Sequence, residues 1–198
     1  PASRALLKLQ GPASFALSGV TLDGGFTTTP ATLSGWNVKD AAALLEIRDC
    51  PRVRLDDVHA TGFYGTRNAI DDPYGQYARG TPVMLDNCQD VSLRRCRLDY
   101  PTFREGFWIN NCQRVRIEDF AYEGGPAYNS KACSTPLHVL GPWTQEVSIE
   151  GFRSRFHNGS AINAGGAGDF RIHDFFVQGR IGTENETSGD AGSPPGGG

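Results

Sequence analysis

A six-residue phrase that recurs six times along the chain is the feature that most constrains its fold. The copies read FALSGV, VRLDDV, VSLRRC, VRIEDF, VSIEGF and FRIHDF, and they begin at residues 15, 53, 91, 115, 147 and 170. The intervals between these starts are 38, 38, 24, 32 and 23 residues. A minimum near two dozen residues with a variable excess indicates one structural unit that carries insertions. The sequence therefore predicts a repeat protein.

Each copy of the phrase predicts two short strands on either side of a tight bend. Its first, third and sixth residues are apolar, as in Val115, Ile117 and Phe120. Alternation of this kind, interrupted once by a pair of bend residues, is typical of two strands that meet at a corner. Gly or Asp often occupies the second bend position, and both tolerate left-handed backbone better than most residues. We therefore expect a sharp corner in every repeat.

A third strand is predicted upstream of each phrase. Apolar residues lie eight and six positions before the phrase, with a shift of two residues in the fifth repeat: Leu7 and Leu9, Leu45 and Ile47, Val83 and Leu85, Phe107 and Ile109, Leu137 and Val139, and Ile162 and Ala164. Three short strands bury too little apolar surface by themselves, but they can bury it by stacking on the next repeat. The sequence thus predicts an all-β fold of about six rungs, each rung being the three strands of one repeat.

This pattern of corners and stacked strands resembles the right-handed parallel β-helix (solenoid) of the pectin-lyase-like superfamily. The resemblance covers about residues 7–178. It implies one β-helix domain over residues 1–180 with long loops on one side, followed by a Gly/Pro/Ser-rich tail or linker over residues 181–198. The irregular rungs are most similar to phage tailspike and head-spike modules. That similarity implies recognition of a bacterial surface polysaccharide and a location outside the cell or on the virion surface.

Four of the five cysteines are expected to be structural. Cys50, Cys88 and Cys112 each lie three residues before a phrase, and Cys96 takes an apolar position within one. Neighbouring rungs stack about 4.8 Å apart, so the first three thiols should form a buried ladder. A disulfide between ladder neighbours is the alternative in an oxidising compartment. Because the chain has no CxxC pair and no zinc-type Cys/His spacing, neither a metal site nor a cofactor is expected.

The charged bend residues are expected to form a ladder of opposite charges. On three consecutive rungs they are Asp56 and Asp57, Arg94 and Arg95, and Glu118 and Asp119. Exposed ion pairs contribute about 0–1 kcal/mol each. The ladder should therefore help to fix the stacking order rather than carry chemistry.

Candidate binding residues lie on the outward face of the third strand, between and after the inward pair. They are Glu46, Arg48, Met84, Asp86, Trp108, Asn110, His138 and Asn163. An aromatic face with carboxylates, amides and a cation suits a sugar chain, whose ring faces stack on Trp and whose hydroxyls need donors and acceptors. The resemblance implies a polysaccharide groove along this strand and its flanking loops, at about residues 23–43, 61–81 and 124–136. Tyr74, Arg79 and Glu105 are therefore added to the predicted binding site.

Glycan recognition is the first functional prediction, and glycan cleavage is the second. Glu46 and Asp86 are diagonal on adjacent rungs, where a separation near ~8 Å would suit the acid/base pair of an inverting hydrolase. A lyase would instead use Arg48, His138 or Tyr128 beside an activated uronate. The catalytic series of polygalacturonases, pectate lyases and alginate epimerases are absent from the sequence. A purely structural spike segment is the third alternative, in which Trp108 packs under a loop and the charges are merely solvated.

Composition limits the classes of partner. A net charge of −3 gives no basic field, so nucleic acid is not an expected partner. No apolar run approaches the ~20 residues of a membrane helix, so membrane insertion is not expected. Neither end shows an amphipathic cap, and uncapped strands expose edges that invite pairing. We therefore expect a homo-oligomer, for example a trimer, or a segment of a larger spike chain.

Overall fold

The described part of the chain is built from parallel β-strands. The computed structural model describes residues 5–24, 43–62, 81–99, 104–124, 133–157, 160–166 and 168–179, and these contain no helix. Accordingly, none of them forms a helix long and apolar enough to cross a membrane. The prediction of an all-β fold is confirmed. Most of the predicted loop residues and the predicted tail at 181–198 lie outside the described residues.

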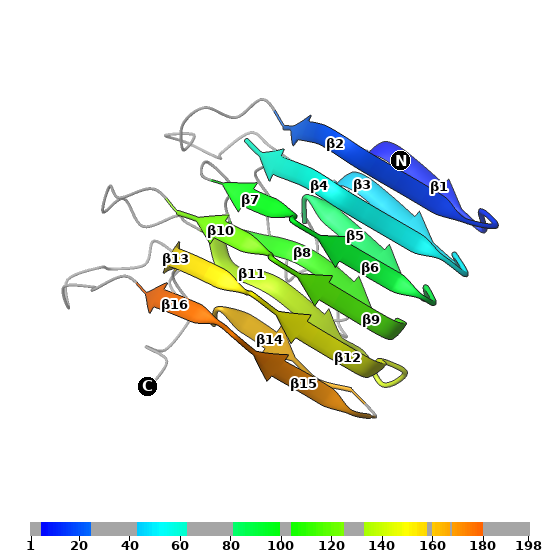
Figure 1. Cartoon of the computed structure of the whole chain (residues 1–198). Coiled ribbons are helices and arrows are strands. Elements are labelled where there is room, and N and C mark those ends of the chain that lie inside the picture. Colours follow the sequence, from blue (N-terminus) through cyan, green and yellow to red (C-terminus); the bar gives the residue numbers. More distant parts are fainter. Residues whose placement is uncertain are drawn as a thin grey trace, which may run out of the picture.

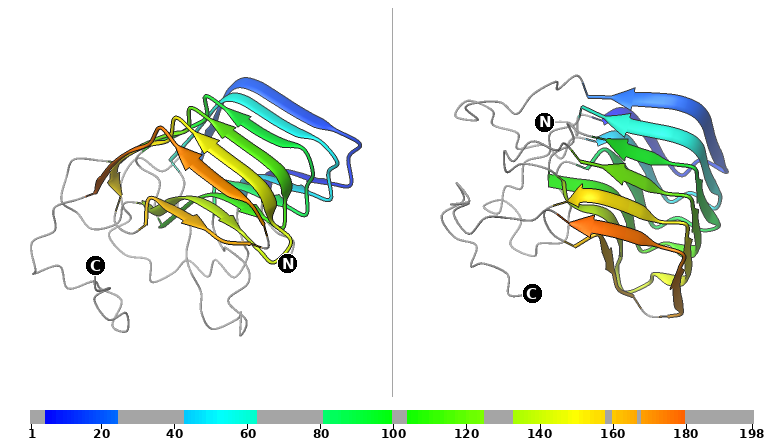
Figure 2. Two further views of the ribbon diagram at one scale, coloured as in Figure 1. Left: turned by 60° about the horizontal axis from the view of Figure 1, so that its bottom comes forward. Right: turned by 60° about the vertical axis from the view of Figure 1, so that its left-hand side comes forward.

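The strands form two sheets, which lie face to face (Figures 1 and 2). The six-stranded sheet has the order β1 (Ala5–Gln10), β3 (Ala43–Arg48), β5 (Val83–Asp86), β8 (Arg104–Asn110), β11 (Cys133–Leu140) and β14 (Ile162–Ala164). The ten-stranded sheet contains β2 (Phe15–Asp23), β4 (Val53–Thr61), β6 (Val91–Arg94), β7 (Arg97–Asp99), β9 (Gln113–Glu118), β10 (Ala121–Glu123), β12 (Gln145–Glu150), β13 (Arg153–His157), β15 (Phe170–His173) and β16 (Phe176–Gly179). All of these pairings are parallel.

Consecutive repeats occupy adjacent places in both sheets. Each repeat gives one strand to the six-stranded sheet and one long strand or two short strands to the ten-stranded sheet. The register follows the phrase, because Val53 pairs with Val91 and Val91 pairs with Val115. The predicted shift of the fifth repeat is also confirmed, since Leu137 pairs with Phe107.

The predicted corner within each phrase is confirmed at all six copies. The second bend residue has a positive φ in every case: Gly19 (65°), Asp57 (55°), Arg95 (51°), Asp119 (54°), Gly151 (70°) and Asp174 (53°). This is the left-handed region, which Gly and Asp enter more easily than most residues. The chain can therefore turn sharply there and start the next strand in register.

A second series of corners, which the sequence argument missed, follows the strands of the six-stranded sheet. It lies four residues before the phrase, where the backbone φ is positive: Gly11 (65°), Asp49 (54°), Asn87 (53°) and Asn111 (52°). The Asn87 Nδ2 group donates a hydrogen bond of 2.6 Å to Asp49 Oδ1 on the neighbouring repeat. The signal was present in the sequence, because Gly, Asp and Asn at one fixed position are the residues that such a turn favours.

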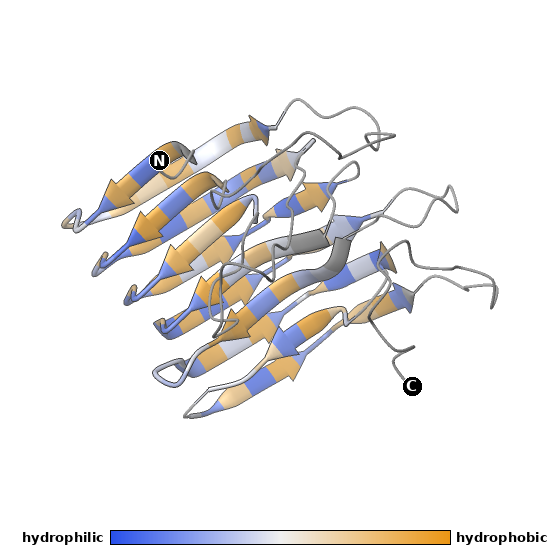
Figure 3. Cartoon of the chain, turned by 180° about the vertical axis from the view of Figure 1, so that it is seen from behind, coloured by the Kyte–Doolittle hydropathy of each residue, from blue (hydrophilic) through white to orange (hydrophobic). Residues whose placement is uncertain are grey.

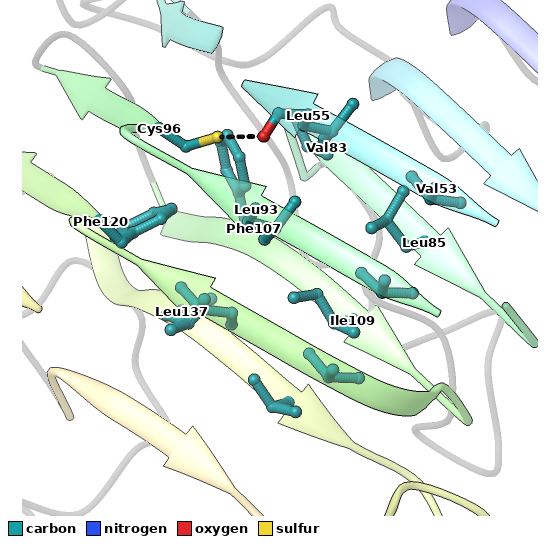
Figure 4. Packing of buried hydrophobic residues seen from close by; sticks show 14 of the residues in the cluster. Val53, Leu55, Val83, Leu85, Leu93, Cys96, Phe107, Ile109, Phe120 and Leu137 are labelled. Atoms are coloured by element: carbon teal, nitrogen blue, oxygen red, sulfur yellow. Dashed lines mark hydrogen bonds between the residues drawn. The ribbon is translucent and has the colours of Figure 1, made fainter. Parts of the chain in front are cut away.

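The hydrophobic core lies between the two sheets. The apolar residues of the phrases and of the upstream strands meet there, and those of the central repeats are almost completely buried (Figure 4). The Phe107 ring packs edge-on against Phe120 at a centroid distance of 5.1 Å, and the Phe152 ring stacks on Phe120 at 5.8 Å. Neighbouring repeats and opposite sheets are therefore joined by one continuous set of contacts.

The predicted ladder of buried thiols is confirmed for Cys50, Cys88 and Cys112, and Cys96 is buried in the core. These four cysteines are free, so the disulfide alternative is wrong for them. The Cys88 backbone N–H approaches Cys112 Sγ at 3.4 Å, and Cys96 Sγ donates to the Leu55 carbonyl at 3.6 Å (Figure 4). Burial raises the pKa of Cys96 to about 11. This thiol is therefore protonated at neutral pH and a poor nucleophile.

The charged bends also stack as predicted. Asp56, Arg94 and Glu118 are register partners on β4, β6 and β9. Asp56 forms its ion pair with the residue after its register partner, because Arg95 Nη2 lies 2.7 Å from Asp56 Oδ1. Both side chains are partly exposed, so the pair contributes about 0–1 kcal/mol.

Candidate functional site

The predicted binding row exists as a continuous line across the six-stranded sheet. Glu46, Met84, Trp108 and His138 are successive register partners on β3, β5, β8 and β11, and Asn163 follows on β14. A second line runs beside it through Arg48, Asp86 and Asn110. Figure 3, which shows the molecule from the side of this sheet, has hydrophilic and hydrophobic residues alternating along its strands. We call these two lines together the polar row.

Glu46 is the most deeply buried charged residue of the polar row. Its side chain is 3% exposed, although it alternates with the core-facing residues of β3. Glu46 Oε1 lies 2.7 Å from Arg48 Nε and 3.1 Å from Lys8 Nζ on β1. Two nearby cations offset part of the cost of removing this carboxylate from water.

Asp86 shares a cation with Glu46. Arg48 Nη1 lies 3.8 Å from Asp86 Oδ2, and Asn110 Nδ2 donates a hydrogen bond of 2.9 Å to Asp86 Oδ1. The Arg48 guanidinium therefore stands between the two carboxylates that were predicted to form a hydrolytic pair. Their catalytic role stays a prediction, and both are held as charge partners of one arginine.

Trp108 and His138 form the aromatic part of the polar row. Their rings stack with centroids 4.3 Å apart and an interplanar angle of 29°. His138 is buried, whereas Trp108 is partly exposed. Because His138 covers one face of the indole, a sugar can stack only on the other face or contact the ring edge. Sequence reasoning placed both residues in the row, but it did not pair them.

For the other predicted binding residues, the structure describes the side chain of Asn163 only. Asn163 is exposed on β14, the last strand of the sheet. Glu105 lies on β8, three residues before Trp108, but its side chain is not among those described. Tyr74 and Arg79 lie outside the described residues.

One group of possible metal ligands occurs in the described part of the chain. Glu150 and His173 are register partners on β12 and β15, and Asp174 follows at the corner. Their ligand atoms all lie within 4.8 Å of one another, and all three residues are exposed. His173 Nδ1 lies 3.2 Å from Asp174 Oδ2, which already provides these two side chains with a partner.

A buried polar pair that the sequence argument missed lies on β13. Ser154 Oγ and His157 Nδ1 are 2.9 Å apart, and both residues are buried. Burial lowers the pKa of His157 below its ordinary value, because removal from water penalises the charged imidazolium. The pair is enclosed, so it acts as a structural hydrogen bond rather than a nucleophile and base.

Acidification is expected to destabilise the folded chain through His157. Its pKa is lower in the folded state than in the unfolded state, where it is about 6.5. The unfolded state therefore binds more protons below that pH, and the contribution of neutral His157 is lost as the pH falls towards the folded pKa. Urea denaturation at about pH 7 and about pH 5 should show a smaller loss of stability in a His157→Gln variant than in the wild type. Equal losses in the two proteins would contradict this role.

Comparison with known proteins gives no information about the role of the polar row. No model of a protein family matches the chain, and no curated protein and no solved structure matches it. The row combines a partly exposed indole, two carboxylates, two amides and an arginine within one sheet face. Chemically, such a face can contact a ligand that has both apolar and hydroxyl-rich surfaces.

Proposed function

We propose that the chain is a right-handed parallel β-helix of the pectin-lyase-like type, similar to the spike modules of phages. The support for this proposal is the order of the strands, because consecutive repeats occupy adjacent places in two parallel sheets. Corners with left-handed backbone recur at fixed positions in the repeats. A solenoid gives this combination directly, since each repeat contacts only its neighbours.

The proposed function is recognition of a bacterial surface polysaccharide along the polar row. The observation that carries it is the register alignment of Trp108 with charged and amide side chains across several strands. An extended glycan that crosses the strands would meet a new polar group at each repeat, about 4.8 Å further on. Carboxylates and amides can then accept and donate hydrogen bonds with sugar hydroxyls, while the free part of the indole contacts a ring face.

Recognition is favoured over cleavage by the contacts of the two carboxylates. An inverting hydrolase needs its two carboxyl groups free to act on opposite sides of the scissile bond, with room for a water. Glu46 and Asp86 instead both lie close to the Arg48 side chain, and Glu46 also lies close to Lys8. Cleavage is therefore the alternative function, and an activity assay tests it.

An array of purified bacterial surface polysaccharides tests the proposal directly. The wild-type chain is expected to retain at least one glycan, and Trp108→Ala should weaken that binding about tenfold, the equivalent of about 1.4 kcal/mol. Trp143→Ala is the matched control, because Trp143 is 68% exposed and lies outside the polar row. Thermal unfolding followed by circular dichroism shows whether the variants remain folded.

Three outcomes separate the alternatives. Equal binding by Trp108→Ala and the wild type contradicts a site on the polar row. No binding to any glycan supports a purely structural spike segment. Release of reducing ends or unsaturated products by the wild type, abolished in a Glu46→Gln/Asp86→Asn variant, supports the hydrolase or lyase instead.

We also propose that the chain works outside the cell or on a virion surface, as an oligomer or as part of a larger spike. The supporting observation is the last described repeat, where positions that face the core elsewhere are exposed. Ile172 is 39% exposed, Phe175 is 62% exposed and Val177 is 43% exposed. Contact with further protein would remove this apolar surface from water. Sedimentation as a monomer at every concentration tested would contradict self-association of this chain.

A further inference from the structure

The outward face of the ten-stranded sheet carries a regular row of arginine and serine. Arg54, Ser92, Arg116, Ser148 and Arg171 are successive register partners on β4, β6, β9, β12 and β15. They occupy the second position of the phrase, between the inward first and third residues, and therefore point away from the core. Because adjacent strands are about 4.8 Å apart, successive arginines recur about every 10 Å along the row.

A hollow lies over the middle of this arginine–serine row. It has a volume of about 440 Å³ and is lined by Arg54, Asp56, Ser92, Arg94, Arg116 and Glu118. This volume falls within the roughly 300–1,000 Å³ typical of ligand pockets. A second hollow of about 250 Å³ shares Arg54, Ser92 and Arg116 with the first. The small Ser92 side chain between two long arginines leaves the space open.

Each carboxylate that lines the first hollow forms an ion pair with an arginine, and two other arginines of the hollow form no ion pair with a described residue. Arg116 Nε lies 2.6 Å from Glu118 Oε1, and Arg95 Nη2 neutralises Asp56 from the corner beside it. Within the described part of the chain, no carboxylate lies within ion-pair distance of Arg54 or Arg94, and both are exposed. The hollow therefore presents two guanidinium groups and a serine hydroxyl to an incoming anion, and guanidinium is well suited to carboxylate oxygens.

We propose that this hollow binds the acidic groups of a linear acidic glycan. Ser92 is the register partner of Arg54 and lies two residues before Arg94 on the adjacent strand, so the two unpaired guanidinium groups flank the serine diagonally. A sugar unit in an extended glycan advances the chain by about as much as one strand spacing. A glycan that crosses from β4 to β6 would therefore bring acidic groups to Arg54 and Arg94 and a hydroxyl to Ser92. The choice of a glycan as ligand rests on the proposed function, but the surface is a second one, on the opposite sheet from the polar row.

Binding of hyaluronan oligosaccharides, which alternate acidic and neutral sugars, tests the inference by isothermal titration calorimetry. The wild type should bind them, should not bind neutral dextran, and should lose affinity as salt increases. Arg54→Gln/Arg94→Gln should weaken the binding at least tenfold. The control Arg97→Gln/Arg153→Gln removes the same charge from exposed positions of the ten-stranded sheet outside the hollow, and it should leave the affinity within about twofold of the wild type.

The remaining outcomes distinguish this inference from the proposed function. Equal losses in the two double variants would mean that only net charge matters, and would overturn the inference. Equal binding of dextran, or no hyaluronan binding by the wild type, would overturn it as well. If Trp108→Ala abolishes hyaluronan binding while Arg54→Gln/Arg94→Gln does not, the polar row is the glycan site and the hollow is not. Retention by Trp108→Ala with loss in Arg54→Gln/Arg94→Gln supports the hollow.

Discussion

Replacing Phe120 by alanine is expected to lower the free energy of unfolding by about 3–5 kcal/mol. The ring is fully buried and touches Phe107 from the opposite sheet and Phe152 from the next repeat. Truncation removes its buried apolar surface and leaves a cavity, because backbone corners on both sides limit how far the repeats can collapse. Urea denaturation followed by circular dichroism measures the loss.

The same position of the phrase provides a control within the chain. Phe175 is the sixth residue of the last copy, as Phe120 is of the fourth, but it is 62% exposed. At concentrations at which the chain is monomeric, Phe175→Ala should therefore cost less than about 1 kcal/mol, since little burial is lost. A cost as large as that of Phe120→Ala would show that packing between the sheets is not the source of stability at this position.

Replacing Gly106 by alanine is expected to destabilise the fold by more than about 3 kcal/mol, above the usual range for overpacking. A Cβ atom on Gly106 would lie 1.9 Å from the Pro136 carbonyl oxygen and 2.6 Å from Pro136 Cα on β11. These are backbone atoms, so relief requires β8 and β11 to separate where their register is already irregular. The Gly106 carbonyl also accepts a hydrogen bond from Thr81 Oγ1, which the movement would disturb.

Gly165→Ala is the matched control for this prediction. Its Cβ atom would meet only the Leu140 side chain, at an ordinary contact distance of 3.7 Å. The midpoint of thermal unfolding should fall strongly for Gly106→Ala and change little for Gly165→Ala. Similar midpoints for the two variants would show that the β8–β11 pairing can relax around a side chain.

The polar row shows how far sequence reasoning reaches into the candidate site. Alternation placed Glu46, Trp108 and His138 on one face, and the repeat register aligned them, as the strand pairings confirm. It did not reveal that Arg48 lies between Glu46 and Asp86, or that His138 covers the Trp108 ring. Periodicity determines which face a side chain is on, but rotamers and neighbouring strands determine what it contacts.

Other features could have been found from the sequence with a closer reading. The second position of the phrase reads Ala, Arg, Ser, Arg, Ser, Arg, so the arginine–serine row is visible once the copies are aligned. Gly106 in the middle of a strand pattern is a known signal for close approach of another backbone. Neither signal identifies the residues on the other side of the contact, because the hollow and the Pro136 contact depend on residues from other repeats.

By itself, the sequence determined the repeats, their strands, their register and the corners within the phrase. These properties follow from local rules, since inward residues alternate along a strand and left-handed turns favour particular residues. The tertiary structure alone decided that Glu46 is buried between two cations, that Phe120 joins two sheets and that Arg54 and Arg94 border an open hollow. Each of these depends on atoms from different strands, whose positions are set only when the repeats pack together.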